Sequence, residues 1–113
     1  MKVSELAAQP DFSAVTLPDE GREVTGVYIG DLLSWVMAHG EEGMAWVTVQ
    51  THLNVIAVAA LAEMACVILP EGIEMEQDVL DKANAEEMCV LSSPLTAYEI
   101  CGRLAAQGIP AHG

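Results

Sequence analysis

The regular alternation of short apolar runs with segments of helical length limits the possible folds most. From Thr25 onward, nearly unbroken apolar or β-branched runs recur, as expected for strands buried on both faces. The runs are Thr25–Ile29, Ala45–Val49, Ala65–Leu69 and Met88–Leu91. A segment long enough for a helix follows each run. The pattern predicts four βα units, with parallel strands joined by crossover helices.

Helix signals lie in the segments between these runs. In the first, Asp31 is the predicted N-cap and Gly40 the predicted stop. The second, about 53–64, is apolar almost all round, which predicts cover on both sides, the second cover being another subunit. The third and fourth, about 76–86 and 95–107, carry an inward apolar face and an exposed polar face.

The segment before Thr25 is patterned more weakly. Ser4 is the predicted cap of a short helix through Ala8, and Ser13–Leu17 is a candidate first strand. The sequence therefore predicts an α/β fold with a mostly parallel four- or five-stranded sheet and flanking helices. We expect one single domain over residues 1–113.

Charge excludes two classes of partner. The chain has 4 Lys and Arg against 17 Asp and Glu, for a formal net charge of −13. Nucleic acids and anionic membrane surfaces are bound through Lys and Arg, so neither is an expected partner. The apolar stretch 53–69 is too short, and too interrupted by Asn54 and Glu63, to span a bilayer. Residues 1–9 lack an apolar leader segment, so we expect a cytoplasmic protein.

Known cofactor signatures are absent from the sequence. It has no GxxxxGK[ST] loop and no GxGxxG turn, so neither a nucleoside-triphosphate engine nor a dinucleotide site is predicted, and no cofactor is expected. The three cysteines, Cys66, Cys89 and Cys101, match no metal or redox spacing and are expected to be reduced packing residues.

Polar and small residues collect where the predicted strands end. Since parallel strands joined by right-handed crossovers end at one edge of the sheet, these residues form a candidate ligand site. The set is Asp31, Thr51, His52, Asn54, Ser92, Ser93 and Thr96. We expect Thr51 and Asn54 to cap and donate, His52 to contact a polar ligand group, and the serines to close the opposite wall. Helix capping alone explains the same residue types equally well.

Catalytic and metal roles for His52 are weaker hypotheses. A metal would need further ligands from Asp31, Glu71 or Cys66, which have no diagnostic spacing. A Ser-His-Asp arrangement could combine Ser92 or Ser93 with His52 and Asp31, but no nucleophile-elbow sequence surrounds either serine. We therefore predict no metal and no catalytic residue. Binding of a small anionic ligand remains a hypothesis, because the helix N-termini offer free backbone N–H groups.

Three stretches carry a family resemblance. Residues Arg22–Ser34, Trp46–Asn54 and Ser92–Glu99 resemble stand-alone DRTGG-domain proteins, and the resemblance covers nearly the whole chain. The family is similar to the N-terminal domain of HPr kinase/phosphorylase, and its domain also occurs in CBS-containing pyrophosphatases and phosphotransacetylases. The family's two namesake turns are replaced here by Gln50-Thr51-His52 and Pro70-Glu71-Gly72.

The resemblance implies an α/β fold, dimerisation and a regulatory or ligand-sensing role, with a nucleotide or phosphorylated metabolite as ligand. It implies no catalysis, because the P-loop domain behind the family's serine-kinase label is missing. We therefore expect a non-catalytic sensor acting as a homodimer. The alternative is a structural interaction module without a small ligand, in which the apolar second helix is the partner surface.

Overall fold

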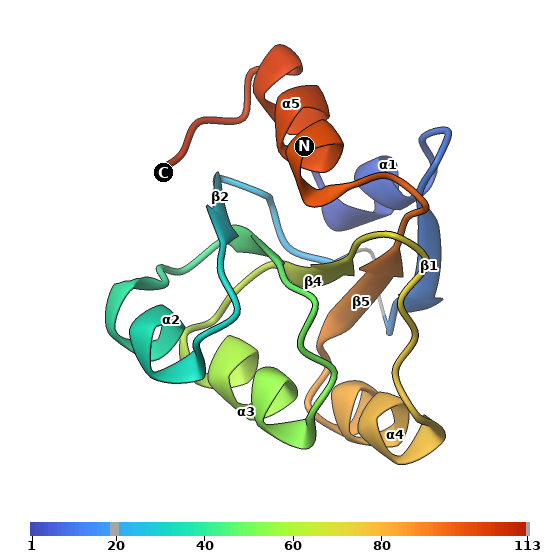
Figure 1. The fold of residues 1–113 in the computed structure, drawn as a ribbon, viewed down its shortest axis with the longest axis vertical. Coiled ribbons are helices and arrows are strands. Elements are labelled where there is room, and N and C mark those ends of the chain that lie inside the picture. Colours follow the sequence, from blue (N-terminus) through green and yellow to red (C-terminus); the bar gives the residue numbers. More distant parts are fainter. Residues whose placement is uncertain (19–20, 113) are drawn as a thin grey trace.

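A computed structural model describes residues 1–18 and 21–112 of the chain. Along the chain, helices and strands follow one another as α1 (Val3–Ala7), β1 (Ser13–Thr16), β2 (Gly26–Ile29), α2 (Leu33–His39), β3 (Met44–Val47), α3 (Leu53–Leu61), β4 (Cys66–Leu69), α4 (Gln77–Ala85), β5 (Cys89–Ser92) and α5 (Ala97–Ala106). The strands form one five-stranded sheet in the order β1-β5-β4-β3-β2 (Figure 1).

The sheet is mostly parallel, as predicted, and has five strands. Strands β2 to β5 are parallel neighbours in chain order, and each is followed by a helix, so the four βα units are confirmed. Strand β1 pairs antiparallel with β5, an orientation that the sequence did not predict. The sheet is therefore mixed, with one antiparallel pair at one edge.

Helices cover both faces of the sheet. Figure 1 shows α2, α3 and α4 in a row on one face, and α1 and α5 on the other. Alternate residues of the strands belong to two separate hydrophobic cores, one on each face of the sheet. Trp46, Val67 and Val90 pack under α2 to α4, whereas Val47 and Ile68 pack under α1 and α5. This two-sided burial explains the unbroken apolar strand sequences.

Three predicted helix caps are wrong, although α3 begins at Leu53 as predicted. Helix α2 begins after Leu32, without a side-chain cap. The Asp31 carboxylate instead accepts hydrogen bonds from Thr48 Oγ1 at 2.8 Å and Val49 N at 2.9 Å. Tertiary partners on the neighbouring β3 loop thus take the acceptor that a local cap would have used.

The N-cap residues of α1 and α3 also differ from the predicted ones. Lys2 is the N-cap residue of α1, which places Ser4 inside the helix. His52, rather than Thr51, is the N-cap of α3, and its Nδ1 accepts from Asn54 N at 3.1 Å. An imidazole nitrogen can replace the usual cap oxygen because it also accepts from an N–H group.

Helix α3 is covered on one side by the rest of the chain. Its residues Val55, Ile56 and Ala59 are fully buried, whereas Ala57 and Leu61 are exposed. The helix is therefore apolar on an open face as well as on a packed face. In the part of the chain that the structure describes, no helix is both long and apolar enough to cross a membrane.

Candidate functional site

The strand order spreads the predicted site residues along one edge of the sheet. Asp31 follows β2 and Ser93 follows β5, with β3 and β4 between those strands. Adjacent strands are ~4.8 Å apart, so the ends of β2 and β5 are about 14 Å apart. Because each crossover moves to the next strand on the same face, the parallel strands have no switch point where a single crevice would open.

The predicted residues consequently line different hollows. Thr51 and His52 border a hollow of about 330 Å³ next to Asp78 of α4. Asn54 borders an apolar groove of about 330 Å³ between α2 and α3. Ser92 and Ser93 border a third and larger cavity.

Two of the predicted residues are helix caps. Thr96 Oγ1 accepts from Glu99 N at 3.2 Å, and the Glu99 carboxylate accepts from Thr96 N at 3.1 Å, which forms a capping box at the start of α5. His52 is the N-cap of α3, where its Nδ1 accepts from Asn54 N. No group of three or more candidate metal ligands occurs within residues 1–18 and 21–112, around His52 or elsewhere.

A cavity lies where β4 and β5 end, beside the antiparallel strand β1. It has a volume of about 470 Å³, within the range of small-molecule sites. Its walls come from β1, from the ends of β4 and β5, and from the connection between β4 and α4. The lining residues are Ser13, Val15, Leu69, Gly72, Ile73, Glu74, Met75, Leu80, Ser92, Ser93 and Pro94.

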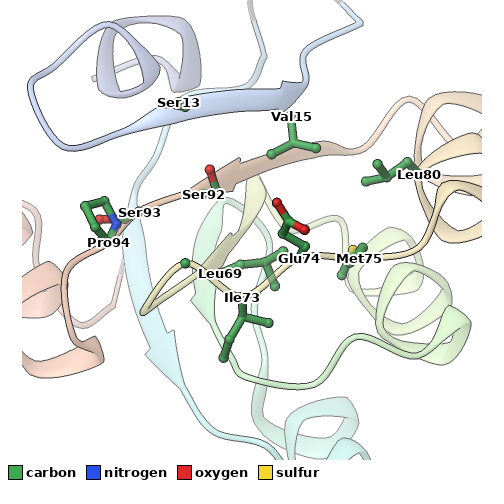
Figure 2. A pocket seen from close by; sticks show the side chains of 11 residues that line it. Ser13, Val15, Leu69, Ile73, Glu74, Met75, Leu80, Ser92, Ser93 and Pro94 are labelled. Atoms are coloured by element: carbon green, nitrogen blue, oxygen red, sulfur yellow. The ribbon is translucent and has the colours of Figure 1, made fainter.

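Polar groups of this cavity point into a space with apolar walls. Figure 2 shows the Glu74 carboxylate directed toward the region between Ser92 and Val15. Within the described part of the chain, no residue hydrogen-bonds the side chains of Ser13, Ser92 or Glu74. Ser93 Oγ accepts from Leu95 N at 3.1 Å and has no protein acceptor for its own proton. These groups can therefore donate to, or accept from, a ligand without breaking protein contacts.

Backbone hydrogen bonds hold the cavity wall in place. Ser93 N donates to Leu69 O at 3.0 Å, Gly72 N to Ser93 O at 2.9 Å and Glu71 N to Leu95 O at 2.8 Å. They fasten the turn after β4 to the segment after β5. The hydroxyls of Ser92 and Ser93 are thus presented by a wall built before any ligand binds, which lowers the entropy cost of binding.

Among the described residues, no Lys or Arg lines this cavity. Arg103 pairs with Asp11 at 3.0 Å, Lys82 with Glu86 at 3.6 Å, and Arg22 donates to Glu63 O at 2.9 Å, all elsewhere in the molecule. The cavity does present a carboxyl group, that of Glu74. The site is therefore suited to uncharged polar groups or cations, and disfavours a phosphate inside it.

The cysteine thiols are weak candidates for chemistry. Burial, with a smaller contribution from Cys89 beside it, raises the pKa of the Cys66 thiol far above its ordinary value, and burial also raises the pKa of Cys101. A thiol acts as a nucleophile or metal ligand in its deprotonated form. Both thiols therefore remain protonated at neutral pH and serve as packing groups.

Of the eleven residues that line the cavity, the predicted site residues include two, Ser92 and Ser93. Ser13 and Val15 enter through the antiparallel pairing of β1 with β5, where Ser13 lies opposite Ser92. Glu74 and Met75 enter because the β4–α4 connection folds over the strand ends. The candidate strand 13–17 was the available signal for β1, and nothing in the local sequence identified the connection.

Comparison with known proteins supports the fold. No family model matches the sequence, and no curated protein matches it. Among solved structures, the chain is similar to the CBS and DRTGG domains of the regulatory region of Clostridium perfringens pyrophosphatase, complexed with its activator diadenosine tetraphosphate. The TM-score is 0.73 at 15% sequence identity, and the match covers 96% of this chain and 47% of that chain. The resemblance to DRTGG-domain proteins is thereby confirmed at the level of the fold, and this chain spans about half the length of its neighbour.

Proposed function

We propose that this chain is a non-catalytic, cytoplasmic regulatory module that senses a small ligand in the Ser92–Ser93 cavity and acts as a homodimer. The observation that carries the proposal is the cavity itself, which combines apolar walls with the free polar groups of Ser13, Ser92 and Glu74. Such a combination is typical of small-molecule sites, where a few polar groups orient a ligand held by apolar contacts. The regulatory role of the structural neighbour supports the same proposal.

The ligand class follows from the neighbour and from the charges of the cavity. The neighbour was crystallised with a dinucleotide activator, so we propose a nucleotide as ligand. In this chain the nucleoside part would occupy the cavity, because its hydroxyl and amino groups can pair with Ser92, Ser93 and Glu74. The phosphates would point to solvent, because the cavity offers a carboxylate and no Lys or Arg.

Thermal-shift titration with adenosine and with diadenosine tetraphosphate tests this proposal. We expect both to raise the melting temperature, since a ligand at 100 times its dissociation constant adds ~2.7 kcal/mol to the free energy of unfolding. We expect Ser92→Ala to weaken adenosine binding about tenfold, through loss of one hydrogen bond. Ser4→Ala, on helix α1, is the matched control and should leave the binding unchanged.

The outcomes separate the two classes of function. If neither compound changes the melting temperature at saturating concentration, the ligand-sensing proposal is contradicted for nucleotides. The hypothesis of a structural interaction module without a ligand is then favoured. If binding occurs but Ser92→Ala and Ser4→Ala bind equally well, the ligand lies outside this cavity. The hollow beside His52 would then be the next candidate.

A further inference from the structure

The helical layer over β2 to β5 is divided into an uncharged half and an acidic half. Within residues 32–62, which include α2 and α3, the charged side chains are Glu41 and Glu42, although the whole chain carries 17 acidic residues. The neighbouring helix α4 presents Asp78 and Asp81 to solvent. An uncharged surface of two helices therefore lies beside an acidic helix in the same layer (Figure 1).

Large apolar side chains are exposed on the uncharged half. Leu61 on α3 is 73% exposed, Trp35 and Met37 on α2 are 58% and 54% exposed, and Leu32 precedes α2. Met37 and Leu61 face each other across the α2–α3 groove, whose lining includes Ala57. We call this surface, defined by Met37, Ala57 and Leu61, the α2–α3 face.

We infer that the α2–α3 face binds the same face of a second copy of this chain. The inference rests on the homodimer of the proposed function and assigns its interface. Two copies each carry a net charge of −13, so contact through acidic surfaces would set like charges against each other. The α2–α3 face lets apolar side chains meet without that cost.

The acids around the face also suit a two-fold arrangement. Glu41 and Glu42 lie beyond the C-terminal end of α2, and Glu63 lies beyond the C-terminal end of α3. At the N-terminal end of α2, the Asp31 carboxylate is held by Thr48 and Val49. If the helices of two copies cross antiparallel, the glutamates at the C-terminal end of one face lie apart from those of the other. Self-complementary contacts of this kind are what a two-fold axis produces.

Other occupants fit the face less well. An anionic lipid surface would be repelled by the acids that surround the face. A partner with a basic surface would be attracted to the acidic half of the layer instead. A second copy offers the same uncharged apolar centre, and an antiparallel arrangement keeps the glutamates of the two copies apart.

Sedimentation equilibrium with matched variants tests the inference. We expect the wild-type chain to sediment at twice its monomer mass of 12.0 kDa at high micromolar concentration. Leu61→Glu should raise the dimer dissociation constant at least tenfold, because it places two carboxylates in the contact. Tyr98→Glu is the control, since Tyr98 is an 85% exposed side chain on α5, on the other side of the sheet, and should leave the constant unchanged.

Each outcome decides the inference. A wild-type dimer that Leu61→Glu does not weaken, or that Tyr98→Glu weakens equally, would overturn the assigned face but keep the homodimer. A wild-type monomer at all concentrations would overturn both, as would a monomer that binds phosphatidylcholine vesicles. Circular dichroism checks that the variants fold, and Ala57→Glu, at an exposed position in the middle of the face, replaces Leu61→Glu if that variant is unfolded. Adenosine binding, measured on the same variants, tests the sensor role separately.

Discussion

At the scale of single residues, a side-chain hydroxyl satisfies backbone groups where the pairing of two strands is irregular. The register between β1 and β5 shifts between Ala14 and Thr16. Thr16, 4% exposed, donates from Oγ1 to Met88 O at 2.7 Å and accepts from Val90 N at 2.9 Å. The hydroxyl thus satisfies two buried backbone groups where the strand ladder is irregular.

Removing this hydroxyl should be costly. We expect Thr16→Val to lower the free energy of unfolding by about 1–3 kcal/mol, because Met88 O and Val90 N lose their partner in a buried place. Thr16→Ser keeps the hydroxyl and should cost about 0.8 kcal/mol, the value of one buried methyl group. Urea unfolding of both variants measures the difference. A Val variant as stable as the Ser variant would contradict this role of Thr16.

At the scale of elements, helices α3, α4 and α5 end in the same way. In each, two backbone N–H groups beyond the helix bond back into its last turn: Glu87 N to Asn84 O and Met88 N to Ala83 O after α4, with matching bonds after α3 and α5. This is the Schellman arrangement, which needs a left-handed residue after the helix. That residue is Gly108 after α5 but Glu63 after α3 and Glu87 after α4, both with φ 56°.

The glutamate at this position strains the end of α4. We expect Glu87→Gly to raise the free energy of unfolding by about 0.5–1 kcal/mol, because glycine adopts positive φ without steric cost and the change removes a negative charge from a helix C-terminus. Glu86→Gly, at φ −89°, is the control and should destabilise the protein. Thermal unfolding of both variants checks the signs. Equal effects of the two changes would contradict the explanation.

At the scale of the whole molecule, a large negative charge is concentrated in a small folded chain. A charge of −13 is confined to a chain whose radius of gyration is 12.2 Å. Self-repulsion of this size destabilises the compact state and opposes contact between copies through their charged surfaces. The structure pairs Arg103 with Asp11 and Lys82 with Glu86, which leaves most of the acids without a cation.

Salt should therefore stabilise the fold. Between 0.01 and 1 M NaCl the Debye length falls from about 30 to about 3 Å, from above to below the radius of gyration of 12.2 Å. We expect the melting temperature to rise over this range at a fixed protein concentration. The double variant Glu42→Gln and Glu76→Gln, at two exposed positions, should show a smaller rise. A melting temperature that is independent of salt, or that falls, would contradict this account.

The sequence by itself determined the elements of the parallel sheet. Two-sided burial requires apolar strands, and this requirement is local, so runs such as Ala65–Leu69 identified β4 and its neighbours to within about two residues. Helix caps were less predictable. Asp31 is a good cap by type, but its carboxylate is taken by Thr48 and Val49, which lie 17 and 18 residues away in the chain.

Tertiary structure alone decided the cavity and the exposed faces. The order of the strands separates Asp31 from Ser93, and the antiparallel pairing of β1 places Ser13 opposite Ser92. Hydrophobicity showed that α3 is apolar, whereas packing decided which of its sides stays open to a partner. The local hydrophobic pattern indicates which residues are buried. The residues that pack against them come from distant parts of the chain, and the order and pairing of the strands determine which ones they are.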